Sequence, residues 1–208
     1  MAKAPEFVVL IDERTLVRLT RLSTIVLLVL CSACASPGDR GLTLYHGRYT
    51  DNGLVDEILI LQSVHYEDSW ITVAAYSEVI SKPSPDRRWE TEGQVVKHSG
   101  QQDHWEYNAL FLHRWTHYPW SNHTRITSAI GGGLSWATEV PKLELASHTN
   151  EGATQLLSYL LLELTVGIPG FEGLDLVGRI HHRSGVFGLF DGVHGGSNVI
   201  SLGLRYEF

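Results

Sequence analysis

Residues 174–208 read LDLVGRIHHRSGVFGLFDGVHGGSNVISLGLRYEF, and both ends of this stretch alternate with the two-residue period of a β-strand. Near the end of the chain, Ile200, Leu202, Leu204, Tyr206 and Phe208 share one face, and Ser201, Gly203, Arg205 and Glu207 share the other. This pattern fits a strand between hydrocarbon and a polar lumen. Leu174, Leu176, Gly178 and Ile180 form the apolar face of the preceding strand, opposite Asp175, Arg179, His181 and Arg183. Continuing that count puts His182 and Ser184 on the lipid-facing side.

Short alternating segments with turn residues between them recur along the rest of the chain, the weak repeated signal of a membrane β-barrel. The predicted strands are residues 42–50, 70–80, 89–98, 104–117, 125–138, 156–168, 174–184 and 198–208. Their even number predicts an all-β fold, an eight-stranded antiparallel up-and-down transmembrane β-barrel formed by residues 36–208. The run 54–66 is an extra strand, a continuation of the first strand, or a loop.

Several charged residues fall on the inner faces of these strands. The inner side of residues 125–138 is nearly all small, which leaves room in a narrow barrel for bulkier neighbours. Buried charges are normally paired, so we expect a structural polar plug rather than a catalytic centre from Glu90, Glu92, Arg114 and Arg179. Aromatic residues expected at the membrane interface are Trp105, Trp115, Tyr118 and Trp120.

An apolar run at residues 23–35 follows Arg18 and Arg21, which is the layout of an export signal. The triplet Ala33-Cys34-Ala35 is the predicted cleavage site of a signal peptide covering residues 1–35. The n-region before Arg18 is unusually long for such a signal, as expected when a start codon is placed too early. Alternatively, Cys34 becomes a lipidated N-terminus, because residues 31–34 resemble a lipoprotein cleavage box. A retained membrane anchor is disfavoured, because the run is short of the ~20 apolar residues needed to span hydrocarbon.

Composition excludes several classes of function. The chain has 208 residues, 43% of them hydrophobic and 19% charged, which suits one folded domain. A formal charge of -7 without a basic stripe argues against nucleic acid as a partner. None of the eleven histidines has a metal-binding spacing, so we predict neither a metal nor a cofactor.

The closing residues 201–208 look like the C-terminal recognition signal of bacterial outer-membrane proteins, which the barrel assembly machinery reads. That resemblance implies that the last strand ends on the periplasmic side. His182 and Ser184 are then expected at the level of the outer leaflet, which is built of lipopolysaccharide, with residues 185–197 covering them from outside.

Residues 179–184, RIHHRS, resemble the Arg-x-x-His-x-Ser motif of the lipid A 3-O-deacylase family. Members of this family are outer-membrane barrels whose penultimate strand carries a catalytic His and Ser on its outside. The resemblance implies a serine esterase without a cofactor, in which Ser184 attacks the ester at the 3-position of lipid A. His182 would act as the general base and later protonate the leaving sugar oxygen.

The chain departs from the family pattern at two places. The family has a glutamate early in the last strand, where this chain has Asn198, an amide that can orient a histidine without carrying a charge. Asp191, in the preceding loop, is the alternative acid. The family also follows its serine with Asn-Ala, whereas this chain has Gly185-Val186. The N–H of Gly185 is then the predicted oxyanion donor.

Two other classes of function compete with the esterase. The first is a non-enzymatic structural or adhesion barrel whose loops, such as residues 141–154, meet external partners. The second is a small pore, which the inward charges disfavour because side chains fill the interior of an eight-stranded barrel.

Overall fold

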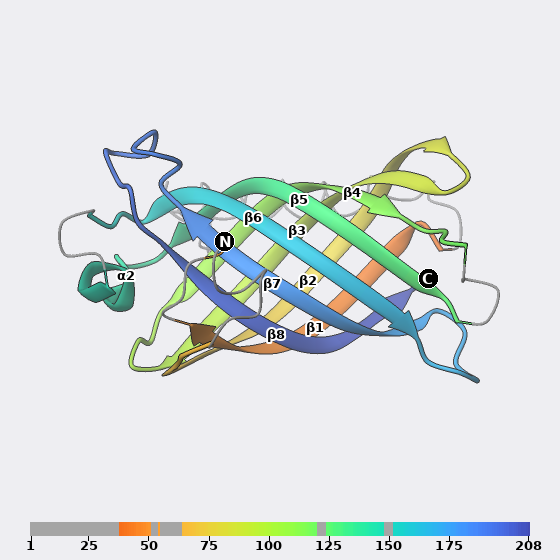
Figure 1. The fold of residues 1–208 in the computed structure, drawn as a ribbon, viewed down its shortest axis with the longest axis horizontal. Helices are drawn as coiled ribbons and strands as arrows, with labels where there is room; N and C mark the ends of the chain where they lie inside the picture. The colour runs from red at the N-terminus through yellow and green to blue at the C-terminus, as the bar shows by residue number, and fades with distance from the viewer. Residues whose placement is uncertain (1–37, 51–53, 55–63, 120–123, 148–151) are drawn as a thin grey trace, which may run out of the picture. The chain divides into compact units, whose positions relative to one another are not determined.

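The computed structural model describes residues 38–50, 54, 64–119, 124–147 and 152–208. Within them, eight antiparallel strands form a closed barrel in which each strand pairs with the next and β8 pairs with β1 (Figure 1). The elements are β1 (Arg40–Thr50), β2 (Tyr66–Ser84), β3 (Arg87–Gly100), β4 (Trp105–Trp115), β5 (Ile126–Ala137), α2 (Lys142–Ser147), β6 (Leu156–Gly167), β7 (Leu174–Ser184) and β8 (Gly196–Glu207). The predicted eight-stranded up-and-down barrel is confirmed. The predicted signal peptide, residues 1–35, and most of the run 54–66 lie outside the described residues.

The outer face of the barrel is apolar, as the alternation predicts. On β8, Leu202 is 66% exposed, whereas Arg205 on the opposite face is 2% exposed. Other exposed apolar residues include Leu42, Leu44, Phe111, Ile130, Leu134, Leu164, Leu176 and Leu204. β4 begins at Trp105 and ends at Trp115, so aromatic residues lie at both of its ends, while Trp120 is outside the described residues. This is the surface expected of a barrel that crosses a membrane.

Part of the barrel interior is apolar, which differs from the expected polar lumen. On β2, Ile71, Val73 and Ala75 point inward and form a buried cluster with Tyr45 and Tyr49 of β1. The outer face of β2 carries Thr72, Ala74 and Tyr76 between these inward positions. The reason is the size of the barrel, because the interior of an eight-stranded barrel is filled by side chains and has no aqueous channel that would require polar walls.

The inward charges form a buried network of ion pairs, which confirms the prediction of a polar plug. Arg114 Nε lies 2.7 Å from Glu90 Oε1. Arg179 Nη1 lies 2.7 Å from Glu92 Oε1, and its Nε donates to Glu163 Oε2 at 2.6 Å. These five side chains come from β3, β4, β6 and β7, so the network joins strands on different sides of the barrel. Each buried charge therefore has a partner of opposite sign.

The helix α2 is attached to the interior of the barrel. Leu143 packs against the apolar cluster of β1 and β2. The carboxylate of Glu144 is buried and accepts hydrogen bonds from Arg183 Nη1 at 2.8 Å and from Ser197 Oγ at 2.7 Å. Burial raises the pKa of Glu144 above its ordinary value. Two side chains of α2, Leu143 and Glu144, are thus directed inward by these contacts, whereas Leu145 is 48% exposed. No helix among the described residues is long and apolar enough to cross a membrane.

Histidines fill the interior near α2. His104, in the turn between β3 and β4, stacks on His98 with ring centroids 4.1 Å apart. Burial and the neighbouring His98 lower the pKa of His104 to about 4, so it is uncharged at neutral pH. Glu106 lies between His98 and His181, with its two carboxylate oxygens 2.8 Å and 3.0 Å from their Nε2 atoms. Within the described part of the chain, no group of three or more His, Cys, Asp or Glu could hold a metal ion.

Candidate functional site

The strand register of β7 and β8 brings His182 and Asn198 together on the outer wall. The two residues are direct partners in the antiparallel ladder, so their side chains leave the sheet on the same face. His181 and Arg183, on either side of His182, are each 1% exposed inside the barrel, and His182 therefore points outward. His182 Nδ1 lies 2.7 Å from Asn198 Oδ1. This contact orients the imidazole ring against β8.

The contact with Asn198 also selects the tautomer of the ring. An amide oxygen only accepts hydrogen bonds, so Nδ1 of His182 carries the proton in this arrangement. Nε2 then holds the lone pair, which is the state required of a general base. Asn198 supplies this orientation without a negative charge to balance an imidazolium ion.

Ser184 shares the outer face of β7 with His182, two residues along the strand. Residues at this spacing have Cα atoms about 7 Å apart. The hydroxyl of Ser184 accepts a hydrogen bond from the N–H of Val186 at 3.1 Å. Both residues are within the described part of the chain, and no hydrogen bond joins His182 to Ser184 there. The structure therefore brings His182 and Asn198 into contact and leaves Ser184 beside them.

The oxyanion role predicted for Gly185 does not fit this arrangement. Its N–H already donates to the carbonyl of Gly195 at 3.1 Å. The N–H that points at the Ser184 hydroxyl is that of Val186, one residue later. Asp191, the alternative acid, is exposed, and no hydrogen bond or ion pair between described residues connects it to His182.

An apolar groove of about 610 Å³ lies on the outer wall directly below His182. The next outward residue of β7, Ile180, lines it, and Gly178 follows. Gly178 pairs with Leu164 on one side and Leu202 on the other, so the missing side chain leaves a hollow between two leucines. The sequence signal for this groove is a glycine among apolar positions, which the alternation alone does not distinguish from its neighbours.

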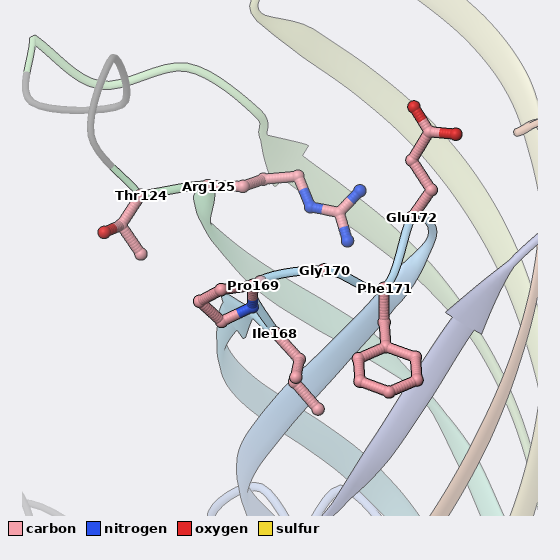
Figure 2. Close-up of a pocket in the computed structure, with 8 residues that line it drawn as sticks. Thr124, Arg125, Ile168, Pro169, Gly170, Phe171 and Glu172 are labelled. Carbon is pink, nitrogen blue, oxygen red and sulfur yellow. The ribbon is translucent and has the colours of Figure 1, made fainter.

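A separate pocket of about 490 Å³ lies at the opposite end of the barrel, beside the turn between β6 and β7 (Figure 2). It is lined by Thr124, Arg125, Gly167, Ile168, Pro169, Gly170, Phe171 and Glu172. None of these eight described residues is a serine or a histidine. Arg125 is paired with Asp175 at 2.6 Å. This pocket is therefore distinct from the site formed by His182, Ser184 and Asn198.

No family model matches the chain. No curated protein matches it either. Solved structures that are similar to it include the following two. One is the outer membrane enzyme PagL, with a TM-score of 0.49 and 12% identity over 81% of this chain and 99% of that chain. The other is Neisserial surface protein A (NspA), with a TM-score of 0.47 and 11% identity over 81% of this chain and 96% of that chain. At these identities the likeness concerns the fold alone.

Proposed function

We propose that the chain is an outer-membrane serine esterase that removes the 3-O-linked acyl chain from lipid A of lipopolysaccharide. The apolar outer wall supports the membrane location. The connections at the end of the barrel near His182 are residues 51–65, 101–104, 138–155 and 185–195, and those at the other end are residues 85–86, 116–125 and 168–173. Outer-membrane barrels have their longer loops outside, which supports an orientation with Ser184 in the outer leaflet.

The observation that carries this proposal is the 2.7 Å contact between His182 and Asn198 on the lipid-facing wall, with Ser184 on the same face. Asn198 is 6% exposed, so its amide is enclosed on an otherwise apolar wall, where a polar group is unfavourable unless it is hydrogen-bonded. The groove below Ile180 is apolar and suits an acyl chain. A lipid with its headgroup at Ser184 and a chain in this groove would place an ester near the hydroxyl.

In the proposed reaction, Ser184 Oγ attacks the ester carbonyl while His182 Nε2 takes its proton. The tetrahedral intermediate collapses to an acyl-serine, and His182 returns the proton to the leaving sugar oxygen. Water, deprotonated by His182, then attacks the acyl-serine, His182 returns this proton to the leaving Ser184 Oγ, and a 3-hydroxy fatty acid is released. The N–H of Val186, which points at the Ser184 hydroxyl in this structure, is our candidate donor to the developing oxyanion. For this reaction the Ser184 hydroxyl must turn towards His182 and donate a hydrogen bond to its Nε2. Hydrogen bonds between a nucleophile and its base are often formed only when substrate is bound.

Mass spectrometry of lipid A from cells with and without the chain tests this proposal. We expect lipid A from cells that contain it to lack one ester-linked hydroxyacyl group. A spectrum identical to that of cells lacking the chain, with the barrel folded in the outer membrane, would refute the esterase assignment.

Asn198 gives a second test of the same chemistry. Asn198→Asp keeps the shape of the side chain and adds a charge, which stabilises the imidazolium ion formed during attack. We expect kcat to rise about tenfold, equivalent to ~1.4 kcal/mol. Asn198→Leu, of similar volume but without an acceptor, should instead lower kcat, as measured by fatty acid release. Equal rates for the two variants would contradict an orienting role for Asn198.

A non-enzymatic barrel remains the second candidate function. The observation that favours it is that no hydrogen bond joins Ser184 to His182 among the described residues, while the Ser184 hydroxyl accepts one from the N–H of Val186. In that case the loops at the outer end would supply the function, and the lipid A spectrum would not change.

A further inference from the structure

The connection between β7 and β8 exposes large apolar side chains immediately after Ser184. Phe187 is 93% exposed and Leu189 is 76% exposed. Val186, next to them, is also exposed. In Figure 1 this connection projects beyond the end of the barrel that is opposite to the C-terminus. Exposed apolar clusters of this kind mark sites of interaction.

The backbone of this connection is folded rather than open. The N–H of Gly188 donates to Val193 at 2.9 Å, and the N–H of Val193 donates to Phe190 at 2.9 Å. A third bond runs from Phe190 to Gly185 at 3.2 Å. The turn therefore has a defined, hydrogen-bonded conformation, and Phe187 and Leu189 are exposed in it.

This turn contains backbone strain at its apolar residues. Val186 has a φ of 48° and Phe187 has a φ of 55°, both in the left-handed region. This region is unfavourable for residues with a side chain, and most of all for a β-branched residue such as valine. Strain that persists in a hydrogen-bonded turn is typical of functional sites. Here the strained conformation presents apolar side chains to the surroundings instead of burying them.

The apolar turn is continuous with the lipid-facing wall. Ser184 belongs to that wall, and the hydrogen bond from the Val186 N–H to its hydroxyl attaches the start of the turn there. Ile180 and Ile200 continue the same outer face below His182 and Asn198. The partner that suits both surfaces is therefore the acyl chains of membrane lipid.

We propose that residues 186–189 insert among the acyl chains of the surrounding lipid and cover Ser184 from the side of the membrane. This inference rests on the membrane location proposed above, and it does not depend on the esterase chemistry. It gives the turn the role of an anchor that holds lipid next to the outer wall of β7.

Spin labelling tests the insertion. The chain has two cysteines, Cys31 and Cys34, so single labels can be attached at Phe187→Cys or Leu189→Cys in full-length chain carrying Cys31→Ala and Cys34→Ala. Asp191→Cys, exposed in the same turn, is the control for water, and Leu202→Cys is the control for the lipid-facing wall. Each labelled barrel is reconstituted in vesicles of phosphatidylcholine and phosphatidylglycerol. Collision of the label with oxygen and with a water-soluble nickel complex is then measured.

We expect the ratio of oxygen to nickel accessibility at positions 187 and 189 to approach that at position 202. It should exceed the ratio at position 191 at least several-fold. If the accessibility ratios at positions 187 and 189 match the ratio at position 191, while the ratio at position 202 remains high, the insertion is overturned and the membrane location stands. A low accessibility ratio at position 202 as well would overturn the membrane location. Low accessibility to both reagents at 187 and 189 would overturn the proposal in favour of a protein contact, such as a second copy of the chain.

Discussion

Replacing Ser184 by alanine is expected to lower the release of 3-hydroxy fatty acid by the proposed esterase at least ~10³-fold, because the variant lacks the hydroxyl that attacks the ester in the proposed reaction. His182→Ala should have a similar effect, because the hydroxyl then loses its base. Residues that act as one unit are not additive, so the double variant should be no slower than either single variant. Fatty acid release from purified lipid A, measured by mass spectrometry, gives these rates.

Ser158→Ala is the matched control for the serine variant. Ser158 lies directly opposite Ser184 in the ladder between β6 and β7, so it occupies the same level of the barrel. We expect this variant to keep the wild-type rate. Heat-modifiable migration on a gel shows whether each variant has formed its barrel. Full activity of folded Ser184→Ala would remove Ser184 from the mechanism.

The second large effect is expected on stability. Arg179→Met should lower the free energy of unfolding by ~3–5 kcal/mol, because it leaves the buried carboxylate of Glu92 without a cation and leaves Glu163 with Arg114 alone. Arg179 also lies over the ring of Tyr45, with Cζ 4.9 Å from the ring centroid, and methionine fills only part of that space. Urea-induced unfolding of the barrel in lipid vesicles measures the change.

Two variants separate the charge effect from a general loss of packing. Lys82 forms an exposed ion pair with Asp39, and Lys82→Ala should change the stability by at most ~1 kcal/mol. Adding Glu92→Gln to Arg179→Met removes the charge that Arg179→Met leaves unpaired and should recover part of the lost stability. If the double variant is as unstable as Arg179→Met or less stable, the loss does not arise from unpaired charge.

The fold could be predicted from the sequence because alternation with a period of two is a local property of each strand. The bounds of β7 were predicted to the residue, and the outward position of His182 followed from the same count. Alternation does not say which of two faces points inward when both are weakly polar. For this reason the inward direction of the apolar residues of β2, such as Ile71, could not be predicted from their spacing.

The details of the site depended on contacts between distant residues. The contact of His182 with Asn198 requires the register of β7 against β8, which follows from counting back along both strands. The hydrogen bonds of Gly185 and Val186 depend on how the chain turns between Ser184 and Gly196, and a glycine-rich turn has many possible conformations. The inward fold of α2 could not be predicted for the same reason, since Glu144 finds Arg183 and Ser197 only once the barrel has closed.

Ser197 and Asn198 are neighbours in the chain, yet one bonds Glu144 inside the barrel and the other contacts His182 outside it. The wall that separates these two contacts is a single layer of backbone, because successive residues of a strand point to opposite sides. Directly behind His182 and Ser184 lies this single layer, and behind the layer lie the side chains that fill the barrel, such as His181 and Arg183. The rigidity of the site must therefore come from sideways pairing within the sheet and from the filling of the barrel behind it.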